Sequence, residues 1–144
     1  RAPMAMLPVS GSHVGDYLQQ WVDIGNTVDK LPGVFHTNWF RKSPDGKWLW
    51  PGFGDNMRVL EWILNKMDGK VEGEEKFVGT VPKFGELNHD GLDFSEEDWN
   101  ALMALVPEEW KSELETQEEF LAKIGDKLPA VVKEQRQALL DRIG

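Results

Sequence analysis

The stretch KWLWPGFGDN, residues 47–56, places the strongest constraint on how this chain can fold. One proline and two glycines within it exclude a continuous helix or strand. The same stretch nevertheless carries Trp48, Trp50 and Phe53. Rings on a turn either fill the protein's own core or stack on a flat ligand. Seven Trp in 144 residues is a high count, so both uses have to be considered.

Two regular elements are predicted before this turn. Apolar residues recur at helical spacing through residues 12–24, and Gly25-Asn26 can end that helix. Residues 34–40, VFHTNWF, are β-branched and aromatic and follow a Pro-Gly breaker, so they predict a buried strand. The Ser-Pro-Asp-Gly turn at 43–46 would let residues 47–50 pair back on that strand as a hairpin.

Helices dominate the predicted structure after the turn. Asp55 can cap a largely buried helix over residues 56–67, whereas residues 68–94 are glycine-rich and irregular, with one short extended piece. Residues 95–144 predict three more helices, whose starts are marked by Ser95 with Asp98, by Pro107 and by Pro129. The predicted fold class is therefore mixed α/β and mostly helical, with a small sheet or hairpin and several packed helices.

Composition excludes several classes of function. A formal net charge of −9 argues against a nucleic-acid surface, because phosphates require a basic patch. The chain has no Cys and only three scattered His, which gives no metal-ligand spacing. Nothing resembles a nucleophile–base pair, a phosphate loop, a signal peptide or a membrane span. We therefore predict no catalytic or metal-binding residues in this chain, no membrane contact and a cytoplasmic location.

The residues of the turn favour one kind of ligand. Aromatic faces stack on a planar base with about 1–3 kcal/mol per contact, and glycine lets the backbone approach closely. A carboxylate at Asp55 would compete with phosphate for the amides that start the next helix. Asp55 and Asn56 offer hydrogen-bond acceptors, which suit guanine, with its adjacent N1–H and 2-amino groups, better than adenine. A Trp-rich hairpin that fills its own core explains the same residues and stays open at this point.

A family resemblance adds to this interpretation. Residues 35–62 read FHTNWFRKSPDGKWLWPGFGDNMRVLEW, and this run closely resembles the nucleotide-base segment of GTP-dependent phosphoenolpyruvate carboxykinases. The opening RAPMAMLP and the GDYLQQW helix also resemble the family's preceding segment, while the helical tail agrees more loosely. The resemblance covers the whole chain, but only the C-terminal portion of the family's proteins.

The resemblance implies roles for five residues. Phe40 and Phe53 would sandwich guanine, Trp39 and Trp48 would surround it, and Asn56 would hydrogen-bond the base edge. Position 48 is usually Phe in the family and is Trp here. The sequence also departs from the family at Ala2, Val9 and Ser12. These departures leave open the role of the loop near the start of the chain.

The resemblance also implies what the chain works with. The family converts oxaloacetate and GTP to phosphoenolpyruvate, GDP and CO2 with Mn²⁺ and Mg²⁺, and its phosphate loop, metal ligands and oxaloacetate-binding arginines lie upstream of Arg1. We expect one unit over residues 1–144, a C-terminal fragment of the nucleotide-binding domain that is inactive alone. Its expected parts are a guanine-binding part (1–67), an irregular linker (68–94) and a helical tail (95–144).

The implied partners are a guanine nucleotide and the missing N-terminal part of the same enzyme. The isolated fragment is expected to form dimers or exchanged segments, because it would expose apolar surface. The alternatives are a free-standing aromatic-rich module that binds carbohydrate or peptide, and a structural cap whose Trp residues are all core.

Overall fold

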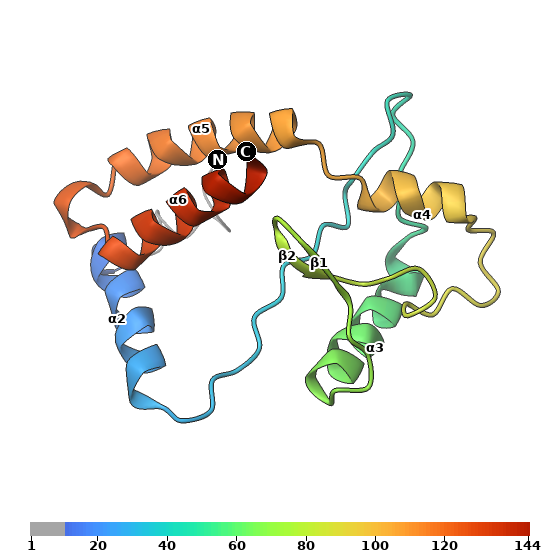
Figure 1. Ribbon diagram of the computed structural model, residues 1–144, viewed down its shortest axis with the longest axis horizontal. Coiled ribbons are helices and arrows are strands. Elements are labelled where there is room, and N and C mark those ends of the chain that lie inside the picture. The colour runs from blue at the N-terminus through green and yellow to red at the C-terminus, as the bar shows by residue number, and fades with distance from the viewer. Residues whose placement is uncertain (1–10) are drawn as a thin grey trace. The chain divides into compact units, whose positions relative to one another are not determined.

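The computed structural model describes residues 11–144, which fall into two compact units (Figure 1). The helical unit joins the chain up to Pro32 to the chain from Val106 onward, and the aromatic unit comprises Gly33–Leu105. All five predicted site residues belong to the aromatic unit. Ala2 and Val9 lie outside the described residues, and the functional division into 1–67, 68–94 and 95–144 stays a prediction.

Over residues 11–32 and 106–144, the helical unit contains three helices and a short 3-10 turn. Its elements are α2 (Val14–Thr27), α5 (Pro107–Ala122), η3 (Gly125–Lys127) and α6 (Ala130–Ile143). Its buried apolar side chains include Leu114, Ile124 and Leu128. Helices α5 and α6 lie side by side (Figure 1), and Arg136 of α6 donates a 3.0 Å hydrogen bond to the Leu114 carbonyl of α5. The prolines occupy their predicted places, Pro107 in the first turn of α5 and Pro129 directly before α6.

The predicted end of the first helix was wrong. Helix α2 continues through Gly25 and Asn26 to Thr27, whose hydroxyl donates a 3.0 Å hydrogen bond to the Ile24 carbonyl. Glycine inside a helix costs only about 1 kcal/mol relative to alanine, so it does not by itself end a helix. Near the other end, a Cβ on Gly15 would lie 2.5 Å from the Lys127 carbonyl oxygen, so this glycine permits the close packing of η3 on α2.

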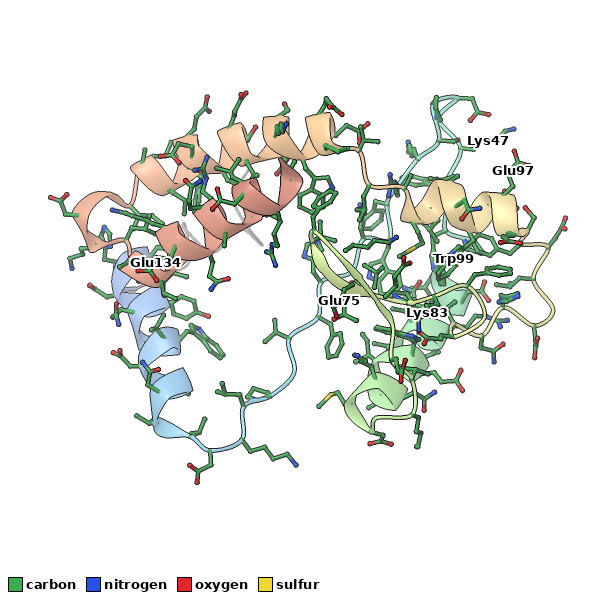
Figure 2. The ribbon with its side chains drawn as sticks, viewed as in Figure 1. Lys47, Glu75, Lys83, Glu97, Trp99 and Glu134 are labelled. Carbon is green, nitrogen blue, oxygen red and sulfur yellow. The ribbon has the colours of Figure 1, made fainter. Side chains whose placement is uncertain are left out.

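The aromatic unit is built around three Trp residues and a small sheet. Its elements are η2 (Phe53–Asp55), α3 (Asn56–Met67), β1 (Glu74–Lys76), β2 (Gly79–Val81) and α4 (Glu96–Met103). Trp50, Leu87 and Trp99 form a buried cluster, and Trp99 is seen on α4 in Figure 2. Trp62 of α3 is buried as well. Helix α4 begins with the predicted capping box, in which the Ser95 hydroxyl accepts from the Asp98 N–H at 3.1 Å.

The sheet is an antiparallel pair of short strands. Strand β1 pairs with β2 in the register Glu74↔Val81, Glu75↔Thr80 and Lys76↔Gly79. The extended piece predicted within residues 68–94 therefore forms a hairpin. Together with the helices it confirms a mixed α/β, mostly helical fold.

Three sequence predictions in this unit were wrong. Residues 34–40 form no strand, and the predicted hairpin is reduced to a single antiparallel bridge between Lys42 and Trp48. A β-branched run becomes a strand only where a second strand pairs with it, and none of the described residues pairs with this run. Helix α3 is not largely buried either: of its residues only Trp62 is buried, and its apolar Met57, Leu60, Leu64 and Met67 are exposed.

Glu86 connects three segments of the aromatic unit. Its carboxylate accepts hydrogen bonds from the backbone N–H groups of Gly73 and Lys83 at 3.1 and 3.2 Å. It also accepts from the Glu72 N–H and the Trp62 indole N–H, both at 3.3 Å. Burial raises the pKa of Glu86, but these N–H groups together outweigh it and hold the pKa below its ordinary value of 4.5.

We expect Glu86→Gln to destabilise the chain by on the order of 1 kcal/mol near neutral pH, because an amide cannot accept all of these bonds. The folded pKa of Glu86 is lowered, so its contribution is present above the unfolded pKa and is lost as pH falls through the folded one. Thermal unfolding followed by circular dichroism should therefore show the wild type and variant converging as the pH falls below 4.5, the ordinary pKa of this carboxyl. Glu61→Gln, an exposed carboxylate on α3, is the control and should change stability little. An equal shift at every pH would contradict the role given to the Glu86 carboxylate.

Candidate nucleotide-base site

A tight turn brings Lys42 and Trp48 opposite each other. The Ser43 N–H donates to the Lys47 carbonyl at 2.9 Å, and the Leu49 N–H donates to the Arg41 carbonyl at 3.0 Å. The Ser43 hydroxyl also bonds to Asp45, and together with the Lys47 side chain it holds the pKa of Asp45 below its ordinary value. Gly46 has φ +85°, which suits glycine at the end of the turn.

Phe40 and Trp48 are in contact and exposed. Their ring centroids lie 6.0 Å apart at an interplanar angle of 67°, an edge-to-face arrangement. Their exposed fractions are 74% for Phe40 and 57% for Trp48. Most of the surface of this pair is therefore open to a ligand.

Phe53 stands apart from this pair and is 90% exposed. It begins η2 directly after Gly52, whose φ of +148° is a conformation that favours glycine. The structure describes no ring contact for Phe53. The two predicted faces of the base sandwich are thus both solvent-exposed, and they are not in contact with each other.

Trp39 and Trp50 differ from these rings, because Trp50 belongs to the core and Trp39 is half-buried. Trp50 is only 6% exposed, and Trp39 packs against it with ring centroids 5.9 Å apart. The Trp50 indole N–H donates a 2.8 Å hydrogen bond to Asn56 Oδ1. Because an indole N–H can only donate, this bond fixes which end of the Asn56 amide faces Trp50.

The orientation of Asn56 changes the chemistry that the sequence predicted for it. Its oxygen already accepts one bond from Trp50, and its NH2 group makes no hydrogen bond with any residue from 11 to 144. The group that Asn56 can offer a ligand is therefore chiefly a donor. Its role at the base edge stays a prediction.

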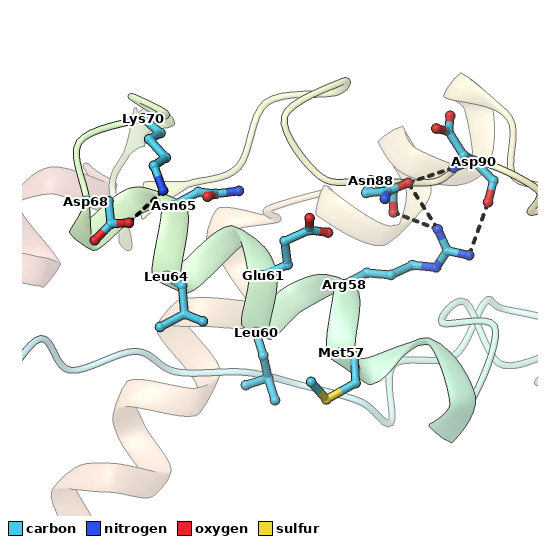
Figure 3. A pocket seen from close by; sticks show the side chains of 10 residues that line it. All are labelled: Met57, Arg58, Leu60, Glu61, Leu64, Asn65, Asp68, Lys70, Asn88 and Asp90. Atoms are coloured by element: carbon cyan, nitrogen blue, oxygen red, sulfur yellow. Dashed lines mark hydrogen bonds and ion pairs between the residues drawn. The ribbon is translucent and has the colours of Figure 1, made fainter.

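Arg58 fixes the first turn of α3 against a neighbouring loop. Its Nε lies 3.0 Å from Asp55 Oδ1, which explains why the Asp55 side chain makes no capping bond although it occupies the predicted cap position. Its other nitrogens donate to the Asn88 and Asp90 carbonyls at 3.3 and 3.1 Å (Figure 3). These bonds hold the first turn of α3, which contains Asn56, against the loop at Asn88 and Asp90.

A shallow hollow of about 770 Å³ lies along α3 and is separate from the aromatic rings. Figure 3 shows Met57, Leu60 and Leu64 pointing to one side of the helix, while Arg58 reaches toward the loop at Asn88. None of the five predicted site residues lines it. Within residues 11–144 there is also no cluster of His, Cys, Asp and Glu arranged to hold a metal ion.

Comparison with known proteins identifies the family. The family described as phosphoenolpyruvate carboxykinase C-terminal P-loop domain matches residues 1–142. The phosphoenolpyruvate carboxykinase [GTP] of Corynebacterium jeikeium is 46% identical over 142 residues, which cover 98% of this chain. That of Anaeromyxobacter dehalogenans is 45% identical over 143 residues, which cover 99%.

The chain belongs to the GTP-dependent phosphoenolpyruvate carboxykinase family. It spans 23% of the length of the Corynebacterium jeikeium carboxykinase and 24% of that of Anaeromyxobacter dehalogenans. The match also confirms the resemblance that was inferred from residues 35–62. Among the helices that the structure describes, none is both long and apolar enough to cross a membrane.

The sequence alone did not reveal the contacts that Trp50 and Arg58 make in this carboxykinase segment. Trp50 was one of three rings on the turn, and only the structure separates it from its exposed neighbours by burial and by its bond to Asn56. The role of Arg58 depends on residues 30 and 32 positions away, which no local pattern reveals.

Proposed function

We propose that this chain is the guanine-base-binding part of a GTP-dependent phosphoenolpyruvate carboxykinase, which converts oxaloacetate and GTP to phosphoenolpyruvate, GDP and CO2. One observation carries the proposal. Phe40, Trp48 and Phe53 expose their rings to solvent, while Trp50, a few residues away, is buried. An exposed group of aromatic rings on a braced scaffold typically marks a binding surface.

Stacking is the first contribution that these rings make. A base placed against Phe40 or Trp48 on one face and Phe53 on the other would gain about 1–3 kcal/mol per stack. We assign the second face to Phe53, which begins the single-turn helix η2 directly after Gly52. The stack supplies affinity for any base and does not by itself select guanine.

Selection then falls to the edge of the base. The free N–H groups of Asn56 match an acceptor, and guanine presents O6 where adenine presents an amino group. This refines the interpretation from sequence, in which Asn56 was an acceptor for N1–H and the 2-amino group. Inosine shares O6 with guanine, so Asn56 should separate both of them from adenine.

We expect Asn56→Asp, made in a full-length carboxykinase that carries this sequence, to lower the GTP-to-ATP ratio of kcat/KM about tenfold through loss of a donor facing O6. Aspartate keeps an oxygen for the Trp50 indole, so the unfolding temperature should change little. Asn56→Ala should lower the same ratio and also destabilise the protein by about 1–3 kcal/mol, because it leaves the Trp50 N–H unpaired.

Asn65→Ala is the matched control. It removes another Asn from α3, one that lines the hollow and lies away from the aromatic rings. It should leave the GTP-to-ATP ratio unchanged. The GTP-to-ITP ratio should stay constant in every variant, because both bases carry O6. A GTP-to-ATP ratio that Asn56→Asp leaves unchanged would rule out Asn56 as the residue that reads the base.

The rest of the reaction falls to other parts of the proposed enzyme. We place the phosphate loop, the oxaloacetate site and the ligands of Mn²⁺ and Mg²⁺ in the portion of the carboxykinase beyond this chain, and the whole protein in the cytoplasm, where GTP is available. The described residues offer no metal-ligand set, so no step of the reaction is assigned to a metal ion here. The family match disfavours the alternative of a free-standing carbohydrate- or peptide-binding module.

The exposed apolar side of α3 fits the same proposal. Met57, Leu60, Leu64 and Met67 face solvent on a helix whose opposite side packs through Trp62. Apolar stripes on helices are normally covered. We assign this face to contact with the remainder of the enzyme.

A further inference from the structure

Lys42 lies directly over one of the exposed rings of the candidate site. Its ammonium nitrogen is 4.1 Å from the centroid of the Trp48 ring, well within the roughly 6 Å range of a cation–π interaction. The contact follows from the backbone, because Lys42 and Trp48 form the antiparallel bridge and so stand opposite each other. Tryptophan is the aromatic side chain that binds a cation most strongly.

We propose that Lys42 is a positioning residue of the base site: it holds the Trp48 ring in the orientation in which a base can stack on it. The inference rests on the proposed function. The ammonium group covers one face of the indole, and Phe40 meets the ring edge-to-face at 6.0 Å. Trp48 remains 57% exposed, so the face opposite the lysine is the one that a base can reach. A ring held in this way loses less freedom when a ligand stacks on it.

The kind of ring at position 48 decides how much this arrangement contributes. An indole is larger than a phenyl ring and has more orientations to lose on binding. A cation fixed across the bridge restricts those orientations, and it binds an indole more strongly than it binds a phenyl ring. Lys42 should therefore matter more with Trp at position 48 than with Phe.

The test replaces Lys42 in a full-length carboxykinase that carries this sequence. Lys42→Met keeps the length of the side chain and removes the charge, and it should raise the KM for GTP about two- to fivefold, with a smaller change in kcat. Lys42→Arg keeps a cation over the ring and should restore the KM. Lys47→Met is the matched control. Lys47 is next to Trp48 in the sequence, and its ammonium group lies in solvent and pairs with Asp45 at 3.1 Å (Figure 2).

A double substitution separates positioning from direct contact with the nucleotide. In a Trp48→Leu background, Lys42→Met should have no further effect on the KM, because the ring that it holds is gone. A persistent effect in that background would overturn the proposal, since Lys42 would then contact the nucleotide itself. An unchanged KM in Lys42→Met, or an equal rise in Lys47→Met, would overturn it as well.

The same set of variants distinguishes this inference from the proposed function. If Trp48→Leu alone leaves the KM unchanged, Trp48 takes no part in base binding, and both the base site as drawn and the role of Lys42 fail. If Trp48→Leu raises the KM but Lys42→Met does not, the base site stands and only the positioning role of Lys42 is overturned.

Discussion

Replacing Phe53 by alanine in a full-length carboxykinase is expected to raise the KM for GTP by about 5- to 150-fold, which corresponds to the roughly 1–3 kcal/mol of one lost base stack. The side chain is 90% exposed and has no described ring contact, so its removal should leave the unfolding temperature almost unchanged. Loss of binding without loss of stability is the signature of a residue that serves a ligand. Steady-state kinetics and thermal unfolding of the same preparation measure the two quantities.

Base specificity provides a second criterion for Phe53→Ala. Stacking does not distinguish the edges of different bases, so the KM values for GTP, ITP and ATP should rise by similar factors. Trp21→Ala, which removes an exposed ring from α2 in the helical unit, is the control and should leave every KM unchanged. If Phe53→Ala bound GTP as well as the wild type, the exposed rings would not form a base sandwich.

A second large effect is expected for the 144-residue chain on its own, which should show no carboxykinase turnover in either direction. Phosphoryl transfer depends on groups that position the phosphates and neutralise their charge. This chain matches only 23% of the length of the Corynebacterium jeikeium carboxykinase, and residues 11–144 contain no metal-ligand cluster. A coupled assay of oxaloacetate formation and consumption measures both directions.

The positive control is the full-length Corynebacterium jeikeium carboxykinase, assayed under the same conditions, which shows that the assay detects turnover. Metal-dependent turnover by a pure preparation of the chain would show that the phosphate and metal sites do not lie elsewhere in the enzyme.

The isolated chain is also expected to self-associate, because the apolar side of α3 is exposed. Light scattering measures this association.

Local signals in the sequence predicted the parts of the fold that depend on neighbouring residues. Ser95 and Asp98 predicted a capping box because the bonds involved span only three residues, and Pro107 predicted a helix start because its missing N–H needs no partner there. The family resemblance was also local, since it rested on an uninterrupted run around the WPGFG turn.

Features that depend on distant residues could not be predicted in this way. Residues 34–40 have the composition of a strand, but a strand requires a partner, and composition does not reveal whether one is present. Three similar rings on one turn gave no sign that Trp50 would be buried while Trp48 and Phe53 would be exposed. The bond from Trp50 to Asn56 then decided which hydrogen-bonding groups remain for a ligand.

The exposed side of α3 also has a chemical consequence. Met57 and Met67 lie on that face, and a thioether in solvent is oxidised to the sulfoxide far more readily than a buried one. The sulfoxide is polar, so air or peroxide would convert an apolar contact surface into one that no longer packs against apolar residues. Among the methionines within residues 11–144, Met57 and Met67 are therefore expected to oxidise first, on the face that we assign to the rest of the enzyme, and reducing storage conditions protect that face.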